Sequence, residues 1–307
     1  MKHFLIILNA IFLYSCSGDE KDTPLKISDI DFVSSTIERC VAEYQSAGII
    51  YADDLTQFYC DSYLIDTTAD LKNFRNLDAV GFAGLGDMDI DFTNFSKISY
   101  FSLYDTYLES LNLTNLSVLN NLTMLELHNN YELRSIDFSA LENLEKVLVL
   151  RSPLKEINTD GLVNLKDLKI YGSFIRHSQH FMAELEAVNF SQNINLEDLI
   201  IVGTTLPSLI LNQHEKLVSL EFSGPLENVY IEAPSLENIG ISGSLLTSID
   251  VSKLPNLKNI RVKHGVLETI NFESNLELMS ADLTNNLLTN DTIEYLDSLP
   301  KHITVIY

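Results

Sequence analysis

The sequence predicts an α/β repeat fold: a curved solenoid with a parallel β-sheet on its concave side, a mostly extended and irregular convex side, and a helical N-terminal cap. The first observation is an apolar pattern, L-x-x-L-x-L, which recurs about every 21 residues. The second is a further apolar pair, with one residue between its members, later in most of these units. This alternation indicates a second extended segment with one buried face.

Each repeat begins at an apolar residue that precedes the first strand of the unit. The unit starts are Leu55, Leu77, Ile98, Leu122, Leu144, Leu165, Leu196, Leu217, Leu236, Leu257 and Leu278. Neither extended segment can bury its apolar face alone, so the units must stack. The unit that begins at Leu165 is 31 residues long, which predicts an inserted loop near residues 175–185.

This pattern resembles the leucine-rich repeats of bacterial cell-surface proteins of the internalin type. The resemblance covers about 11 units, residues 55–283, and it implies a binding protein and no catalytic activity. In that family the ninth position of a unit usually carries an Asn that hydrogen-bonds the turn backbone. Asn130 and Asn286 fit this position, whereas other units carry a hydroxyl residue there, as at Thr106.

Solenoid ends expose their core unless they are capped. At residues 34–54, the capping box Ser35-Thr36-Ile37-Glu38 predicts a cap helix. Cys40 on this helix is expected to form a disulfide with Cys60 on the first strand, since these two cysteines remain in an exported chain once Cys16 carries a lipid. At residues 284–307, a short helix from Asp291 and a last strand are expected to form the C-terminal cap.

The N-terminus predicts export and a lipid anchor. Residues 1–15 combine Lys2 with an apolar run too short to span a membrane, which is typical of a signal peptide. The run ends in Leu13-Tyr14-Ser15-Cys16, which resembles the lipobox of bacterial lipoproteins and implies acylation of Cys16. Residues 16–33 are then expected to form a tether, and the alternative is an ordinary secretory signal followed by a chance Cys.

Charge restricts the partners. The chain has 20 basic and 43 acidic residues, a formal net charge of −23. It therefore lacks the basic surface that nucleic acids require, and any membrane attachment should depend on the lipid at Cys16. We expect the protein in the bacterial cell envelope, in the outer membrane, with exposure at the cell surface suggested by the acidic residues that follow Cys16.

The sequence contains none of the usual local signatures of nucleotide, hydrolase or zinc chemistry, so no catalytic residues, cofactor or metal are predicted. Residues 87–91 contain three Asp at alternate positions but lack the Gly and Glu of a calcium loop. His177, His180 and Glu184 in the insertion have spacing compatible with a transition metal, and we interpret them as residues of a solvated loop.

Alternate residues of the first strand should form the concave surface, because positions four and six of each unit are buried. Several are aromatic or apolar, which predicts a binding face for a protein or glycan. The predicted contact residues are Tyr59, Tyr100, Tyr104, Met124, Glu126, His128, Lys146, Leu148, Lys169 and Tyr171. The alternatives are a self-associating envelope lipoprotein and a hydrolase with its site in the insertion.

Overall fold

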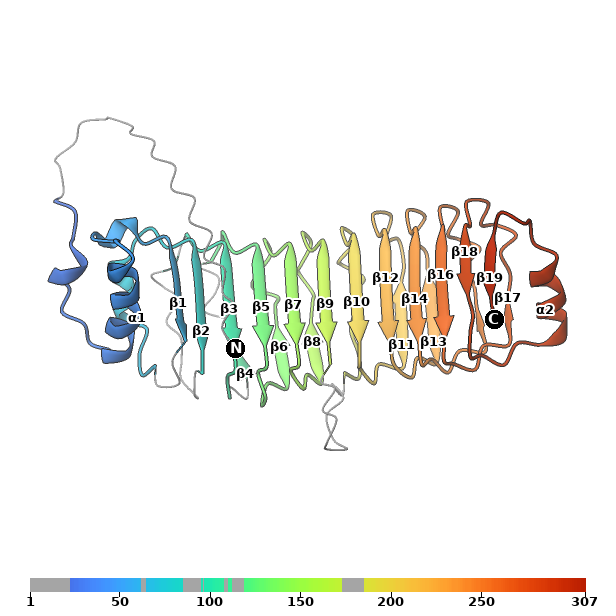
Figure 1. The fold of residues 1–307 in the computed structure, drawn as a ribbon, viewed down its shortest axis with the longest axis horizontal. Helices are drawn as coiled ribbons and strands as arrows, with labels where there is room; N and C mark the ends of the chain where they lie inside the picture. Colours follow the sequence, from blue (N-terminus) through green and yellow to red (C-terminus); the bar gives the residue numbers. More distant parts are fainter. Residues whose placement is uncertain are drawn as a thin grey trace, which may run out of the picture.

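The structure is a computed structural model that describes residues 23–61, 65–84, 95, 97–107, 110–111, 119–172 and 185–307. Figure 1 shows an elongated molecule in which parallel strands lie side by side, with helix α1 at one end and helix α2 at the other. One 12-stranded parallel sheet runs the length of the repeat array. This sheet is the one predicted for the concave side.

Eleven strands of the large sheet come from the repeats and the twelfth from the C-terminal segment. In spatial order they are β1 (Gln57–Asp61), β2 (Ala79–Ala83), β3 (Tyr100–Tyr104), β5 (Met124–His128), β7 (Lys146–Leu150), β9 (Asp167–Tyr171), β10 (Asp198–Val202), β12 (Ser219–Ser223), β14 (Asn238–Ser242), β16 (Asn259–Lys263), β18 (Ser280–Asp282) and β19 (Thr304–Ile306). Each repeat strand starts two residues after its predicted unit start.

The predicted alternation within these strands is also confirmed. In β5 and β9, for example, the second and fourth residues are buried and the others are half-buried. The buried side chains form one continuous apolar core behind the sheet. The other side chains form the outer surface of the large sheet, which we call the sheet face.

The second extended segments form three small parallel sheets on the opposite side. Their strands are β4 (Ser110–Leu111), β6 (Ser135–Asp137), β8 (Glu156–Asn158), β11 (Ser208–Leu211), β13 (Asn228–Ile231), β15 (Ser248–Ile249) and β17 (Thr269–Ile270). The remaining helical elements are α1 (Ser35–Ser46), α2 (Asn290–Asp297) and the 3₁₀ turns η1 (Ile27–Asp29), η2 (Ala52–Asp54) and η3 (Ala69–Asn73).

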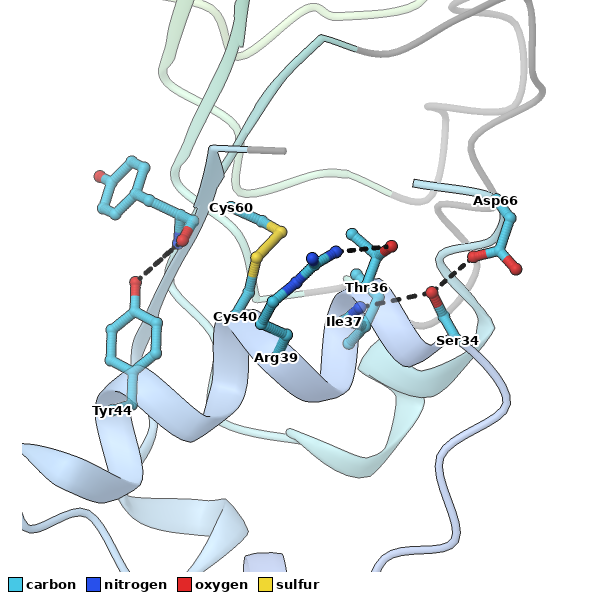
Figure 2. Close-up of a disulfide and its surroundings, with 9 residues drawn as sticks. Ser34, Thr36, Ile37, Arg39, Cys40, Tyr44, Cys60 and Asp66 are labelled. Atoms are coloured by element: carbon cyan, nitrogen blue, oxygen red, sulfur yellow. Dashed lines mark hydrogen bonds between the residues drawn. A yellow bond between two sulfur atoms is a disulfide. The ribbon is translucent and has the colours of Figure 1, made fainter. Parts of the chain in front are cut away.

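Helix α1 covers the first repeat, and the predicted disulfide fixes it there (Figure 2). Cys40 and Cys60 are bonded, with a sequence separation of 20 residues. Closing a loop of that size stabilises the folded state by about 3 kcal/mol in the chain-entropy model. Tyr44 of α1 also protects the outer edge of β1, since its hydroxyl accepts a hydrogen bond from the backbone N–H of Tyr59 at 2.8 Å. An edge strand partly covered in this way is a poorer template for pairing with another chain.

The helix begins one residue earlier than the capping box predicts. Ser34 is the N-cap, and its Oγ accepts a hydrogen bond from Ile37 N at 3.3 Å. Ser34 Oγ also donates to Asp66, whereas the Asp70 carboxylate accepts hydrogen bonds from the backbone N–H groups of Val33 and Ser34. The cap is therefore fixed to the first repeat by long-range contacts that a local motif cannot predict.

The predicted tether is too long. Residues 16–22 lie outside the described residues, but the chain packs onto the cap from Leu25 onward. Leu25 O accepts a hydrogen bond from Ala52 N, Lys26 forms an antiparallel bridge with Tyr51, and Ile27 is fully buried. Burial of the Ile27 side chain, favourable by roughly 2 kcal/mol, offsets the entropy of ordering this segment.

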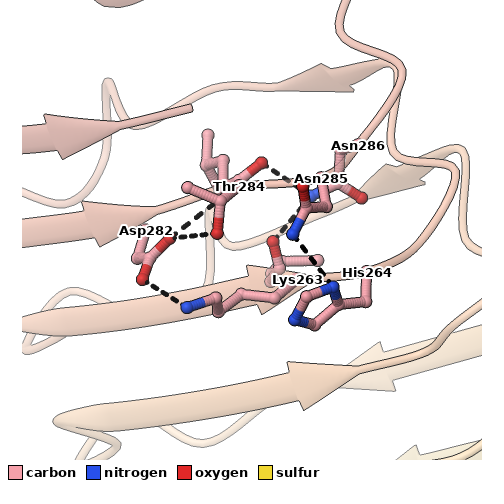
Figure 3. Close-up of polar contacts among 8 residues, drawn as sticks. Lys263, His264, Asp282, Thr284, Asn285 and Asn286 are labelled. Carbon is pink, nitrogen blue, oxygen red and sulfur yellow. Dashed lines mark hydrogen bonds and ion pairs between the residues drawn. The ribbon is translucent and has the colours of Figure 1, made fainter.

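Asn286 makes the turn contacts that the family pattern implies. Its Nδ2 donates to the carbonyl oxygens of Val262 and Leu283, at 2.7 and 2.8 Å. These bonds join the last two repeat turns (Figure 3). Asn130 sits at the same position in its unit, where its Oδ1 accepts a hydrogen bond from the Thr106 hydroxyl of the preceding unit. At this position, the Asn130 and Thr106 side chains thus link two neighbouring turns by a hydrogen bond to each other.

A second interior position, three residues before each unit start, carries apolar residues in most units and polar residues in three. Asn193 and Asn275 are buried there, and each donates two hydrogen bonds to carbonyl oxygens of the preceding unit, at 2.7 to 3.0 Å. His214 occupies the same position and is fully buried. Burial lowers the pKa of His214 below its ordinary value of 6.5.

The His214→Asn variant is expected to remove part of the acid sensitivity of the fold. As the pH falls through about 6.5, the unfolded chain binds a proton at His214 while burial keeps the native ring neutral. The free energy of unfolding should therefore decrease by up to about 1.4 kcal/mol per pH unit until the lowered native pKa is reached. Urea denaturation of both proteins at pH 7.5 and 5.5 measures this effect. Equal pH slopes in the two proteins would refute it.

Candidate functional site

The predicted contact residues lie on the sheet face, in strands β1, β3, β5, β7 and β9. Lys146 is exposed and the other nine are half-buried. The structure brings five of them together, and we call this group the tyrosine cluster: Tyr59, Tyr100, Tyr104, Glu126 and His128. The other five, Met124, Lys146, Leu148, Lys169 and Tyr171, lie on the same face outside this group.

Small residues in β2 make room for the tyrosine cluster. The sheet-face positions of β2 are Ala79, Gly81 and Ala83. A Cβ atom on Gly81 would lie 2.5 Å from both Tyr59 Cδ1 and Ser102 Oγ, so only glycine accommodates the Tyr59 ring at this place. The rings of Tyr59 and Tyr100 meet edge to face with centroids 6.3 Å apart. Tyrosine rings from β1 and β3 therefore approach each other across the intervening strand.

Three groups converge on one carboxylate oxygen. The hydroxyls of Tyr100 and Tyr104 donate to Glu126 Oε2 at 2.8 and 3.0 Å, and they lie 3.3 Å from each other. His128 Nε2 lies 3.3 Å from the same oxygen, and the His128 ring lies 4.5 Å, centroid to centroid, from that of Tyr104. Every ring in the group is thus held by at least one polar or aromatic partner, which reduces the entropy lost when a ligand binds.

The electrostatics fix the protonation states. His128 beside Glu126 holds the pKa of that carboxyl below its ordinary value, and the two tyrosine hydroxyls act in the same direction. Burial raises the pKa of Tyr59 to about 12, and it also raises the pKa of Tyr100 and of Tyr104. At neutral pH the cluster is therefore a carboxylate anion that accepts hydrogen bonds from neutral tyrosines.

Most basic residues of the sheet face are paired within the chain. Lys169 Nζ lies 3.1 Å from Asp167 and 3.0 Å from Asp198, on its own strand and the next. Arg261 pairs with Glu221 at 3.2 Å, and Lys263 pairs with Asp282 at 2.9 Å (Figure 3). Their positive charges are consequently compensated. Within the part of the chain that the structure describes, Lys146 is the basic sheet-face residue for which no ion pair is found.

Comparison with known proteins places the fold. No family model and no curated protein matches the sequence. Among solved structures, the functional domain of InlJ from Listeria monocytogenes matches with a TM-score of 0.54 and 19% identity, over 85% of this chain and 61% of that one. The internalin inlF from Listeria monocytogenes matches with a TM-score of 0.55 and 17% identity, over 92% and 91%. The chain has the leucine-rich-repeat fold.

Mouse RP105, in its complex with MD-1, gives a TM-score of 0.57 and 18% identity over 82% of this chain and 45% of that one. All three identities are below 20%, so these likenesses concern the fold. The chain spans 61% of the length of the InlJ domain and less than half of the RP105 chain.

Two residues of this leucine-rich-repeat surface were missed by the sequence analysis. Tyr107 and Tyr131 follow the ends of β3 and β5, and they are 58% and 42% exposed. Their rings lie 5.7 Å apart, and the Tyr131 hydroxyl donates to Asp105 at 3.2 Å. Both occur nine residues after their unit start. The sequence could have predicted this pair, because tyrosines at the same position of two consecutive repeats lie next to each other in the stacked units.

The residues on which the metal and insertion hypotheses depend are not among those that the structure describes. His177, His180 and Glu184 belong to the undescribed segment 173–184, and the acidic segment 87–91 and Cys16 are undescribed as well. Among the residues that are described, no group of three or more His, Cys, Asp or Glu could hold a metal ion. No helix in the same residues has the length and apolar character needed to cross a bilayer.

Proposed function

We propose that this protein is a recognition module that binds a protein partner through the sheet face, with the tyrosine cluster at the centre of the contact. The observation that carries the proposal is the convergence of two half-buried tyrosines on one carboxylate, with a third tyrosine packed against them. Tyrosine is enriched among the residues that dominate protein interfaces, because its large ring has few rotatable bonds and one polar end.

The fold supports this proposal. A parallel sheet that runs through eleven repeats offers an extended surface, and solenoid proteins commonly bind partners on such surfaces. The structurally similar mouse RP105 was solved in a complex with MD-1. A glycan is the second candidate ligand, favoured by the exposed ring pair of Tyr107 and Tyr131 beside the Asp105 carboxylate.

We further propose that the module is held on the bacterial outer membrane by lipid at Cys16, with its sheet face available outside the cell. The signal-like residues 1–15 and the lipobox-like segment that ends at Cys16 support this location. Because the chain is strongly acidic, attraction to anionic lipid cannot supply the attachment, and a covalent lipid would.

Partner capture should be lost in the Tyr104→Asp variant and retained in the Tyr230→Asp variant. The first change adds a second carboxylate beside Glu126 and removes one ring of the cluster. The second places the same residue at a 42% exposed tyrosine of β13, on the opposite side of the solenoid. Capture is measured by chemical cross-linking of each purified protein to envelope extracts of the producing bacterium, followed by mass spectrometry.

We expect at least a tenfold loss of cross-linked partner for Tyr104→Asp, the loss typical of an interface hot spot. Thermal denaturation of both variants verifies that the fold is intact. Equal capture by the two variants would show that the partner does not bind at the tyrosine cluster.

A further inference from the structure

We propose that the tyrosine cluster is a receptor site for an arginine side chain of the protein partner, with Glu126 as the acceptor of its guanidinium. This inference rests on the proposed function, since it names the chemistry that the sheet face recognises. It goes beyond that function in predicting a specific residue type on the partner and a specific atom that receives it.

The first argument is the arrangement around the Glu126 carboxylate. Tyr100, Tyr104 and His128 all contact the same oxygen, Oε2. No described residue donates a hydrogen bond to Oε1, and the Glu126 side chain keeps 15% of its surface exposed. One oxygen is thus used to fix the carboxylate, and the other is left as an acceptor on the surface. A ligand with N–H donors can bind Oε1 without displacing any contact of the protein.

The second argument is charge. Glu126, Glu221 and Asp282 are each the fifth residue of their unit and the third residue of their strand, on the sheet face. Glu221 and Asp282 pair with Arg261 and Lys263, whereas no described Lys or Arg pairs with Glu126. The contacts found for the Glu126 carboxylate are the neutral hydroxyls of Tyr100 and Tyr104 and the ring of His128. A cation supplied by a partner would complete at Glu126 the pairing that Arg261 and Lys263 complete elsewhere in the sheet.

The third argument is the aromatic surround. Tyr59, Tyr100 and Tyr104 place π-systems around the carboxylate, and a cation over a tyrosine face is attracted by the ring quadrupole. Arginine suits the site better than lysine because its planar guanidinium stacks on aromatic rings and is more weakly hydrated than an ammonium group. Arginine is also among the residues most enriched at interface hot spots.

The test uses two peptides and a matched pair of variants of the whole chain. Tetra-arginine amide is the probe, and tetra-citrulline amide, which has the same shape without charge, is its control. Glu126→Gln keeps the size of the side chain and an acceptor for the tyrosines. Glu221→Gln makes the same change at the same strand position of the same face, away from the cluster. Binding is measured by titration calorimetry at low ionic strength, where exposed charges are least screened.

We expect tetra-arginine to bind and tetra-citrulline not to bind. Glu126→Gln should weaken tetra-arginine binding about tenfold, as loss of one charge-assisted hydrogen bond does, and Glu221→Gln less than twofold. Equal weakening by both substitutions would mean diffuse attraction to an acidic chain and would overturn the proposal, as would a failure of tetra-arginine to bind. Melting curves must coincide for the two variants.

The arginine site and the proposed function can fail separately. If Tyr104→Asp abolishes partner capture but the two glutamine variants bind tetra-arginine alike, the sheet face is the binding surface and the arginine site is refuted. If partner capture survives Tyr104→Asp, the proposed function itself fails.

Discussion

Replacing Phe82 with alanine is expected to lower the free energy of unfolding by about 4 kcal/mol, the usual cost of truncating a buried aromatic residue. Phe82 is 1% exposed. Its ring makes edge-to-face contacts with Phe58 and Phe101, at centroid distances of 6.2 and 6.3 Å, and Tyr44 of the cap helix extends this row at 6.1 Å from Phe58. Truncation would open a cavity that the cap and the first three repeats share.

The damage should concentrate at the N-terminal end, because each unit of a solenoid contacts only its neighbours. Hydrogen exchange should therefore accelerate in β1, β2 and β3 before it does in β14 and β16. Urea denaturation gives the total change in the free energy of unfolding.

Two variants calibrate the Phe82 measurement. Phe82→Leu keeps an apolar side chain in the core and should cost clearly less than Phe82→Ala. Ile210→Ala, at a residue that is 62% exposed, should change the free energy of unfolding by less than about 0.5 kcal/mol. A Phe82→Ala protein as stable as Ile210→Ala would contradict the role assigned to the aromatic row.

The strands of the large sheet were predictable because the same positions of each repeat unit are buried. Positions four and six of each unit are apolar because they face the core, so a local pattern is enough to locate each strand. This holds even for the 31-residue unit that begins at Leu165. The polar residue Ser34 was harder to interpret. Its choice as N-cap depends on Asp66 and Asp70, more than 30 residues away in the chain.

The candidate site was predictable only as a list of residues. Alternation placed Tyr59, Tyr104 and Glu126 on one face, but it could not show that tyrosines converge on one oxygen. Nor could it show that Gly81 leaves room for the Tyr59 ring to reach Tyr100 across β2. The ion pair of Lys169 could not be predicted either, because its partner Asp198 follows 29 residues later in the sequence but sits on the adjacent strand.

Replacing Cys16 with serine is expected to release nearly all of the protein from the membrane fraction. The thioether to a lipid requires the Cys16 thiol, which serine lacks, and two or more acyl chains are what holds such a protein stably at a bilayer. The acidic chain has no other attraction to anionic lipid. Fractionation of cells grown with a labelled fatty acid measures both the location of the protein and its acylation.

Ser17→Ala, which changes the neighbouring residue and keeps the thiol, is the matched control and should remain labelled and membrane-bound. If Cys16→Ser protein stays in the membrane fraction, the ordinary secretory signal or another attachment is correct and the anchor proposal fails.

Protease treatment of intact cells then shows on which side of the outer membrane the sheet face lies. Cleavage of the control on intact cells would place the sheet face outside, where an arginine-bearing partner would be a molecule of the surroundings, and protection would place that partner in the periplasm.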